Sequence, residues 1–371
     1  MKIEVYSPTI RRKEMDAVLT AMVEDKIGPG ERSRLLKQTA KDYLHFDYAL
    51  ALRSPATALH IALKALNLND GDGVLISALS PRYYAQVLAD LRLTPVYCDV
   101  SYSFPCMGPE NVEKALSAKP AGVQPRCIVL HHTLGFLPDA ASIAVFGIPL
   151  IEDISQSYTP PAAEQNSGLS DVQTDTAEQP QGMGPVNAGV LASANLVILG
   201  LEERDMLTSG GGALLFAMNR KDSAALRNFS NISPEYCLPD INAALAAVQF
   251  KEAARNLARR QEIARVYTQA SLSTKHKRFV PIDNPGCGEY NNYAFPLVLE
   301  TGMKDVSAYA RKKEIIVENA FEQSLTGTGS GDSVLCPVSH SLSLRTVLFP
   351  LYPRLHSQEV QRVSRLIMTL P

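Results

Sequence analysis

A carboxylate and an amide follow directly after a short apolar segment near the middle of the chain. Residues 151–157 read IEDISQS, and residues 149–152 predict a strand. Ligands of parallel α/β sheets bind beyond the carboxyl ends of the strands, so Asp153 and Gln156 are candidates for holding a polar ligand. The alternative is that Asp153 caps a helix and Gln156 forms only local hydrogen bonds.

Neither a metal site nor a hydrolase site is expected. The six cysteines are scattered singly without CxxC spacing, and His131 and His132 have no cluster of Asp, Glu or Cys nearby. We therefore expect reduced thiols and histidines used for packing or stacking. Residues 209–212 (SGGG) lack the Lys-Ser/Thr that completes a phosphate-binding loop, and they predict a tight turn. A Gly-x-Ser-x-Gly motif, the mark of many hydrolases, does not occur.

The composition is that of an ordinary globular protein. The chain has 371 residues, of which 46% are hydrophobic and 20% charged, and its formal net charge is -2. These values exclude a disordered tail protein and a collagen-like repeat, and they disfavour a nucleic-acid partner. The sequence contains neither an apolar run of about 18 residues nor a signal-peptide segment, so we expect no membrane partner and a cytoplasmic location.

Helix-like and strand-like segments alternate through the first 150 residues. Residues 33–43 and 56–66 predict amphipathic helices. Short strands are predicted at 49–52, 74–76, 95–99, 126–131 and 149–152. This alternation predicts an α/β fold with a mainly parallel sheet and helices on both faces.

The second half of the chain predicts a smaller unit joined by a long helix. Residues 241–268 have helical periodicity, and their arginines are expected to form a solvated face: Arg255, Arg259, Arg260 and Arg265. We expect a large α/β domain over residues 1–245 and a small α+β domain, with the linking helix, over residues 246–371. Residues 159–187 are rich in Pro, Gly, Ser, Thr and Gln, which predicts a flexible insertion in the large domain.

Several short motifs follow one another along the chain in a recognisable order. They are GDGV at 71–74, TPVYCDV at 94–100, IEDISQS at 151–157 and LFPLYP at 348–353. Together they resemble the DegT/DnrJ/StrS-type nucleotide-sugar aminotransferases, over nearly the whole chain. The resemblance implies the fold-type I architecture of pyridoxal-phosphate (PLP) enzymes and a homodimer.

The same resemblance implies that the catalytic lysine of the family is absent. In the family a lysine holds the aldehyde cofactor as an imine and moves the proton. Counting back from GGA at 211–213, this position falls on Arg204, and no lysine occurs between Lys119 and Lys221. A guanidinium stays protonated and cannot form the imine. The histidine that replaces the lysine in some family dehydratases does not occur in this segment either.

Most cofactor contacts implied by the resemblance are also changed. The phosphate anchor Ser-Gly-Thr becomes Ser54 followed by Pro-Ala, which removes one N–H donor and one hydroxyl. A second phosphate ligand falls on Leu199, and the partner subunit's asparagine falls on Glu235, whose carboxylate would repel a phosphate. The aromatic residue that stacks on the cofactor falls on Pro81, although Tyr83 or Tyr84 could move in.

Two family positions are retained in this sequence. Asp153 matches the carboxylate that pairs with the pyridinium nitrogen, and Gln156 matches the amide beside the ring hydroxyl. The candidate residues of the substrate pocket are Ser54, His132, Arg204 and Glu235.

Three hypotheses about function follow. The first is a degenerate member of the family that holds no cofactor and binds a nucleotide sugar or an active paralogue in a regulatory or scaffold role in sugar or polysaccharide biosynthesis. The second is an active PLP- or PMP-dependent aminotransferase or dehydratase acting on a nucleotide-linked keto sugar. The third is an interaction module that docks a partner through residues 159–187.

Overall fold

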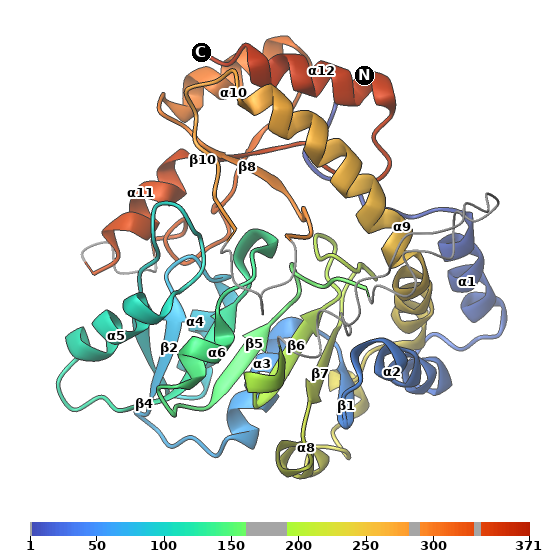
Figure 1. The fold of residues 1–371 in the computed structure, drawn as a ribbon. Coiled ribbons are helices and arrows are strands. Elements are labelled where there is room, and N and C mark those ends of the chain that lie inside the picture. Colours follow the sequence, from blue (N-terminus) through green and yellow to red (C-terminus); the bar gives the residue numbers. More distant parts are fainter. Residues whose placement is uncertain (1, 161–190, 282–289, 330–334) are drawn as a thin grey trace, which may run out of the picture.

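A seven-stranded sheet forms the core of the larger part of the molecule (Figure 1). The computed structural model describes residues 2–160, 191–281, 290–329 and 335–371. The strands lie in the order β1-β7-β6-β5-β4-β2-β3, and only β7 runs against the others. Their bounds are β1 Tyr48–Leu52, β2 Gly73–Ser77, β3 Thr94–Cys98, β4 Pro125–His131, β5 Leu150–Asp153, β6 Leu196–Gly200 and β7 Ala213–Ala217. This confirms the predicted mainly parallel α/β sheet.

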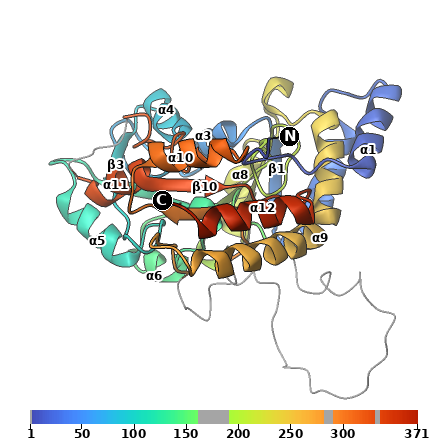
Figure 2. The same ribbon diagram turned by 90° about the horizontal axis from the view of Figure 1, so that it is seen from above.

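Helices cover both faces of this sheet, and the central strands β2 and β6 are therefore buried on both sides. One face packs against α3 (Pro55–Ala65), α4 (Tyr83–Asp90) and α8 (Arg220–Arg227). The opposite face packs against α5 (Pro109–Ala118) and α6 (Ala140–Ala144), and farther along against α2 (Glu31–Leu44) and the first half of α9. Figure 2 shows these two layers of helices from above.

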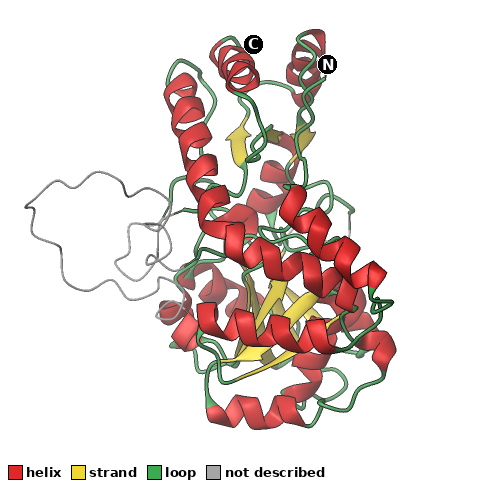
Figure 3. Cartoon of the chain, turned by 90° about the vertical axis from the view of Figure 1, so that its right-hand side faces the viewer, coloured by secondary structure: helices red, strands yellow, loops and turns green. Residues whose placement is uncertain are grey.

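A long helix, α9 (Asp240–Ser271), leads from the large sheet to a second, three-stranded sheet (Figure 3). The second sheet has the antiparallel order β8-β10-β9, with β8 Phe295–Val298, β9 Glu318–Asn319 and β10 Thr346–Phe349. Its helices are α10 Met303–Lys312, α11 Pro337–Arg345 and α12 Ser357–Met368. Near the N-terminus, α1 (Arg12–Val23) packs on α9, and Ile3 is buried in the core of the second sheet.

The arginines of α9 do not all lie on a solvated face. Arg260 is only 5% exposed, and its guanidinium donates to the carbonyl oxygens of Tyr293 and Leu351. The expectation of a solvated face is therefore wrong for Arg260, which ties the long helix to the second sheet. The predicted loop at 159–187 lies almost entirely outside the described residues.

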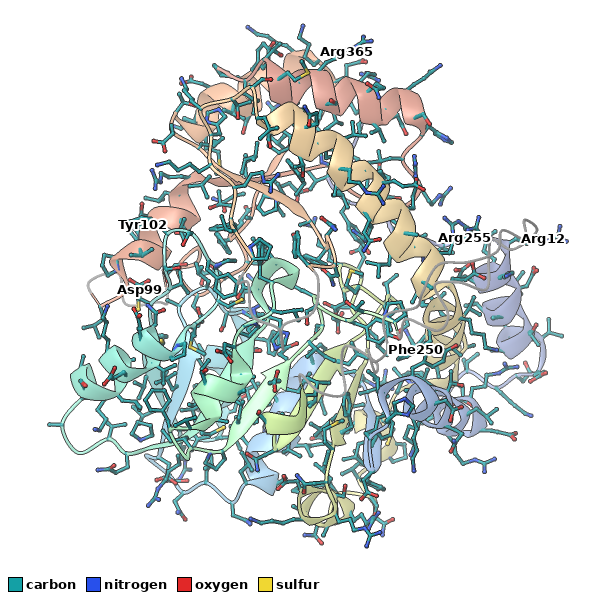
Figure 4. All side chains as sticks on the ribbon, in the orientation of Figure 1. Arg12, Asp99, Tyr102, Phe250, Arg255 and Arg365 are labelled. Atoms are coloured by element: carbon teal, nitrogen blue, oxygen red, sulfur yellow. The ribbon has the colours of Figure 1, made fainter. Side chains whose placement is uncertain are left out.

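Polar contacts hold the second sheet over the carboxyl edge of the first. Asp99, which follows β3, accepts hydrogen bonds from the backbone N–H groups of Val338 and Ser339 at 2.9 and 2.7 Å, at the start of α11 (Figure 4). The backbone of Leu325 and Thr326 donates to Ser80 and Ala78 beyond the end of β2. The carboxyl ends of the parallel strands therefore face a roof built by the second sheet.

Candidate functional site

A cavity of about 630 Å³ lies between the carboxyl ends of the strands and this roof. Its floor comes from the ends of β4 and β5 and from the segment after β6, and its roof from residues 318–324. The polar side chains that line it are His131, Thr133, Asp153, Ser155, Gln156, Glu202, Arg204, Asp205, Glu318, Asn319, Glu322, Gln323 and Ser324, together with Tyr83 and Tyr293. Asp153 and Gln156 thus lie where the strand pattern predicts a ligand.

The carboxylate of Asp153 is bound by groups of its own chain. It is 1% exposed, and its Oδ2 accepts hydrogen bonds from the hydroxyls of Tyr84 at 2.7 Å and Tyr83 at 3.1 Å. Its Oδ1 accepts from the backbone N–H of Ser155 at 3.0 Å and from the Ser155 hydroxyl at 2.5 Å. Burial, and then the negative charge of Asp153, raise the pKa of both tyrosines, so both remain protonated donors. The four bonds leave Asp153 little capacity for a further donor.

Gln156 lines the cavity, and its carbonyl oxygen is used locally. Its Oε1 accepts the backbone N–H of Leu134 at 2.7 Å. Leu134 has φ 56°, an uncommon conformation for a leucine, which this hydrogen bond helps to hold. The side-chain amide of Gln156 supplies the remaining polar group, a donor, to the cavity.

Arg204 lies at the edge of the cavity and does not fill it. Its guanidinium forms an ion pair with Glu318 of the roof at 2.6 Å and lies over the ring of Tyr6. The Arg204 side chain is 57% exposed, so this pair contributes little to stability. The pairing links the segment after β6 to β9 of the second sheet.

The start of α3 offers few free donors for an anion. Pro55 is the first helical residue and has no N–H, and the N–H of Thr57 is taken by Ser54 Oγ at 3.1 Å. Only the N–H of Ala56 is left of the first three positions. Ser54 therefore acts as a helix cap and does not line the cavity.

His132 and Glu235 lie apart from the cavity. His132 is fully buried, with Nε2 at 3.0 Å from Glu152 Oε2 and Nδ1 at 2.7 Å from Ser157 Oγ. Glu235 lies in the exposed turn η4 (Pro234–Tyr236) and accepts from the hydroxyl of Ser233, which lowers its pKa. Of the pocket residues predicted within one chain, Ser54, His132 and Arg204, the cavity brings only Arg204 beside Asp153 and Gln156. Glu235 was predicted to act from a partner subunit, so its position in its own chain does not test that prediction.

Two groups of the cavity were not among the predicted site residues, Asp205 and His131, of which His131 was expected only to pack or stack. The Asp205 carboxylate accepts the backbone N–H of Glu202 at 2.8 Å. Burial raises its pKa well above the usual range, and the charges of Asp153 and Glu202 add to the rise. The one available signal was the polar run 202–205 directly after the apolar strand segment, which places charged groups at the carboxyl edge of the sheet.

His131 ends β4 and is 4% exposed, with its Nδ1 at 3.0 Å from Thr133 Oγ1. Burial lowers its pKa to about 4, although the negative charge of Asp153 acts to raise it. The ring is therefore neutral at neutral pH. Its position beside Asp153 follows from strand order, since β4 and β5 pair in parallel with His131 opposite Asp153.

Solved structures share this architecture at low sequence identity. An aminotransferase, TlmJ, from Streptoalloteichus hindustanus aligns with a TM-score of 0.80 and 18% identity, covering 99% of this chain and 98% of that one. The GDP-4-keto-6-deoxy-D-mannose-3-dehydratase of E. coli, solved with bound hydrated PLP, aligns with a TM-score of 0.76 and 13% identity, covering 99% of both chains. DesV of S. venezuelae, in complex with a ketimine intermediate, aligns at 0.77 and 17% over 96% and 93%. The fold is therefore that of fold-type I PLP enzymes.

A sequence model of a protein family matches most of the chain as well. The match covers residues 8–174 and 215–368, and so passes over the segment that contains Arg204 and Asp205. In the described residues no helix has the length and apolarity needed to cross a membrane. The fold, the order of the motifs and this match establish that the chain belongs to the DegT/DnrJ/EryC1/StrS aminotransferase family.

Proposed function

We propose that this protein keeps the fold of a sugar aminotransferase but does not hold PLP or carry out transamination, and that it binds a nucleotide sugar or an active relative in a regulatory or scaffold role. The observation that carries the proposal is the state of Asp153. Its carboxylate already accepts four hydrogen bonds from Tyr83, Tyr84 and Ser155, where a cofactor's ring nitrogen would need it.

The residues of the cavity do not fit the cofactor in other respects. No lysine is found among the described residues that line it, so an imine has no amine to form on. A phosphate would meet the carboxylates of Glu202 and Asp205 and a helix start with one free N–H near Pro55. The guanidinium of Arg204 is the one cation among the described lining residues, and it is paired with Glu318.

A direct test is to mix the purified protein with PLP, record the imine absorbance and treat the mixture with borohydride. We expect neither an imine band nor a protein adduct by intact mass. A stoichiometric adduct at any lysine would contradict the proposal. A titration with UDP-, GDP- and dTDP-linked sugars, followed by thermal shift, tests the binding role, and we expect stabilisation by at least one of them.

A second function is an active enzyme that binds PLP or PMP without an imine. It is favoured by one observation, the presence of Asp153 and Gln156 together in the cavity lining. For this function Tyr83 and Tyr84 would have to release Asp153. Equilibrium dialysis with PMP separates the two functions, since retention of PMP at a one-to-one ratio supports the second.

A further inference from the structure

The cavity carries an excess of negative charge that its own residues do not neutralise. Among the described residues that line it, five have carboxylates: Asp153, Glu202, Asp205, Glu318 and Glu322. Arg204 is the one cation in the same set, and it is paired with Glu318. Asp153 is satisfied by hydroxyl and amide donors. The carboxyl groups without a cationic partner are therefore those of Glu202, Asp205 and Glu322.

Asp205 is the group whose surroundings most favour a cation. One of its oxygens accepts the N–H of Glu202, and no other donor to its carboxyl is found in the described residues. The side chains that act on the Asp205 carboxyl electrostatically are carboxylates, Asp153 and Glu202. The tyrosines whose pKa values Asp205 helps to raise are neutral: Tyr6, Tyr83 and Tyr293. Burial of such a group as an anion costs free energy, which either a bound proton or an opposite charge beside it relieves.

His131 provides a second, independent observation. Because the Thr133 hydroxyl is placed to donate to the His131 carbonyl oxygen at 3.4 Å, we assign the tautomer in which Thr133 Oγ1 accepts from Nδ1–H at 3.0 Å. In this tautomer Nε2 of the neutral ring is an acceptor. The ring is 96% buried, lines the cavity, and its Nε2 has no partner in the part of the chain that the structure describes. The Nε2 atom itself is not closed off by the chain, so a ligand in the cavity can donate a hydrogen bond to it.

We infer that the cavity binds a small organic primary amine as its ammonium ion, with Asp205 as the ion-pairing carboxylate and His131 Nε2 as a hydrogen-bond acceptor. The inference rests on the proposed function, because the cavity must be free of PLP. The charge disfavours an anionic group inside the cavity, which leaves the diphosphate of a nucleotide sugar outside it, and no cluster of three metal-ligating side chains is found in the described residues. Apolar side chains in the wall, among them Leu79, Phe321 and Leu348, favour an organic ligand over a hydrated metal ion.

Matched ligand pairs test this inference by calorimetry at neutral pH. Each pair differs in its amine: D-glucosamine against N-acetyl-D-glucosamine, and putrescine against 1,4-butanediol. We expect the amine of at least one pair to bind about tenfold or more tightly than its neutral partner, as loss of an ion pair in a partly enclosed site predicts. Equal affinities within both pairs, or no measurable binding of either amine, would overturn the inference.

Two variants assign the preference to the site. Asp205→Asn keeps the acceptor for the Glu202 N–H and removes the charge, and it should abolish the preference for the amine. Asp25→Asn is the matched control, because Asp25 is exposed and its φ of 56° suits asparagine. A preference that survives in Asp205→Asn would overturn the inference. Adduct formation with PLP would instead refute the proposed function, so the two failures are distinguishable.

Discussion

The hydroxyl of Tyr84, from α4, donates to Asp153 Oδ2 at 2.7 Å at the end of β5. Both residues are buried, and Tyr83 donates to the same oxygen. The carboxylate that the family resemblance assigns to a cofactor is thus satisfied by a neighbouring helix. This pairing satisfies the buried carboxylate from within the chain.

Replacing Tyr84 by Phe should weaken the fold measurably. Asp153 Oδ2 would keep only the longer bond from Tyr83, and a charge-assisted hydrogen bond in a buried site would be lost. We expect a loss of about 1–3 kcal/mol in the free energy of unfolding, measured with urea. Tyr102→Phe is the control, since Tyr102 is 59% exposed, and it should change stability little. Equal stability of Tyr84→Phe and the wild type would contradict the role given to this hydroxyl.

Gly200, the last residue of β6, should not tolerate a side chain. A Cβ there would lie 2.3 Å from Asp205 Oδ2 and 2.7 Å from Ser155 Oγ, which itself donates to Asp153. We expect Gly200→Ala to lower the free energy of unfolding by about 1–3 kcal/mol through overpacking. It should also weaken amine binding by displacing Asp205. Gly28→Ala, which meets no atom within 4 Å, should behave as the wild type in both measurements.

Stability should fall as the pH drops through the titration range of His131. Its pKa in the folded state is lowered to about 4, so the unfolded chain binds the proton more readily between about pH 6.5 and 4. The stabilisation from a neutral His131 is complete above pH 6.5 and decreases toward pH 4, by at most on the order of 3 kcal/mol. We expect His131→Asn to have a flatter stability profile over this interval. The control His45→Asn, at an exposed position with φ 54°, should keep the wild-type slope.

The titration of Asp205 should change the stability with pH in the opposite direction. Its pKa is raised in the folded state by burial, so the folded protein binds the proton more readily than the unfolded chain above about pH 4. Stability is therefore lost as the pH rises from the unfolded pKa through the folded one. Asp205→Asn should raise the melting temperature at mildly alkaline pH while it removes the preference for amines. A lower melting temperature for this variant at that pH would contradict the assignment of an uncompensated charge.

Restoring a lysine should not restore the cofactor. In Arg204→Lys the new amine would replace a guanidinium that pairs with Glu318 and belongs to a side chain that is 57% exposed. Asp153 would still be bound by Tyr83 and Tyr84. We expect no imine band and no borohydride-trapped adduct above that of the wild type. A stoichiometric adduct at residue 204 would contradict this prediction, because it would show that the arginine at this position is by itself enough to prevent imine formation with PLP.

The sequence alone was sufficient for the fold, because apolar periodicity and strand-end polar residues depend on short stretches of chain. The predicted strand at 149–152 corresponds to β5, and the helix at 56–66 corresponds to α3. The absence of lysine from residues 120–220 and the proline after Ser54 are likewise sequence facts, and together with the family resemblance they lead to the hypothesis that the protein does not use PLP.

Tertiary structure decided which side chains meet. Asp153 and Tyr84 are separated by 69 residues, and Arg204 and Glu318 by 114, so no local pattern predicts either contact. His132 and His131 are neighbours in sequence, yet alternation along the strand end directs one to Glu152 and the other into the cavity. The acidic character of the cavity follows from the convergence of strand ends and roof, which only the packing of the two sheets brings together.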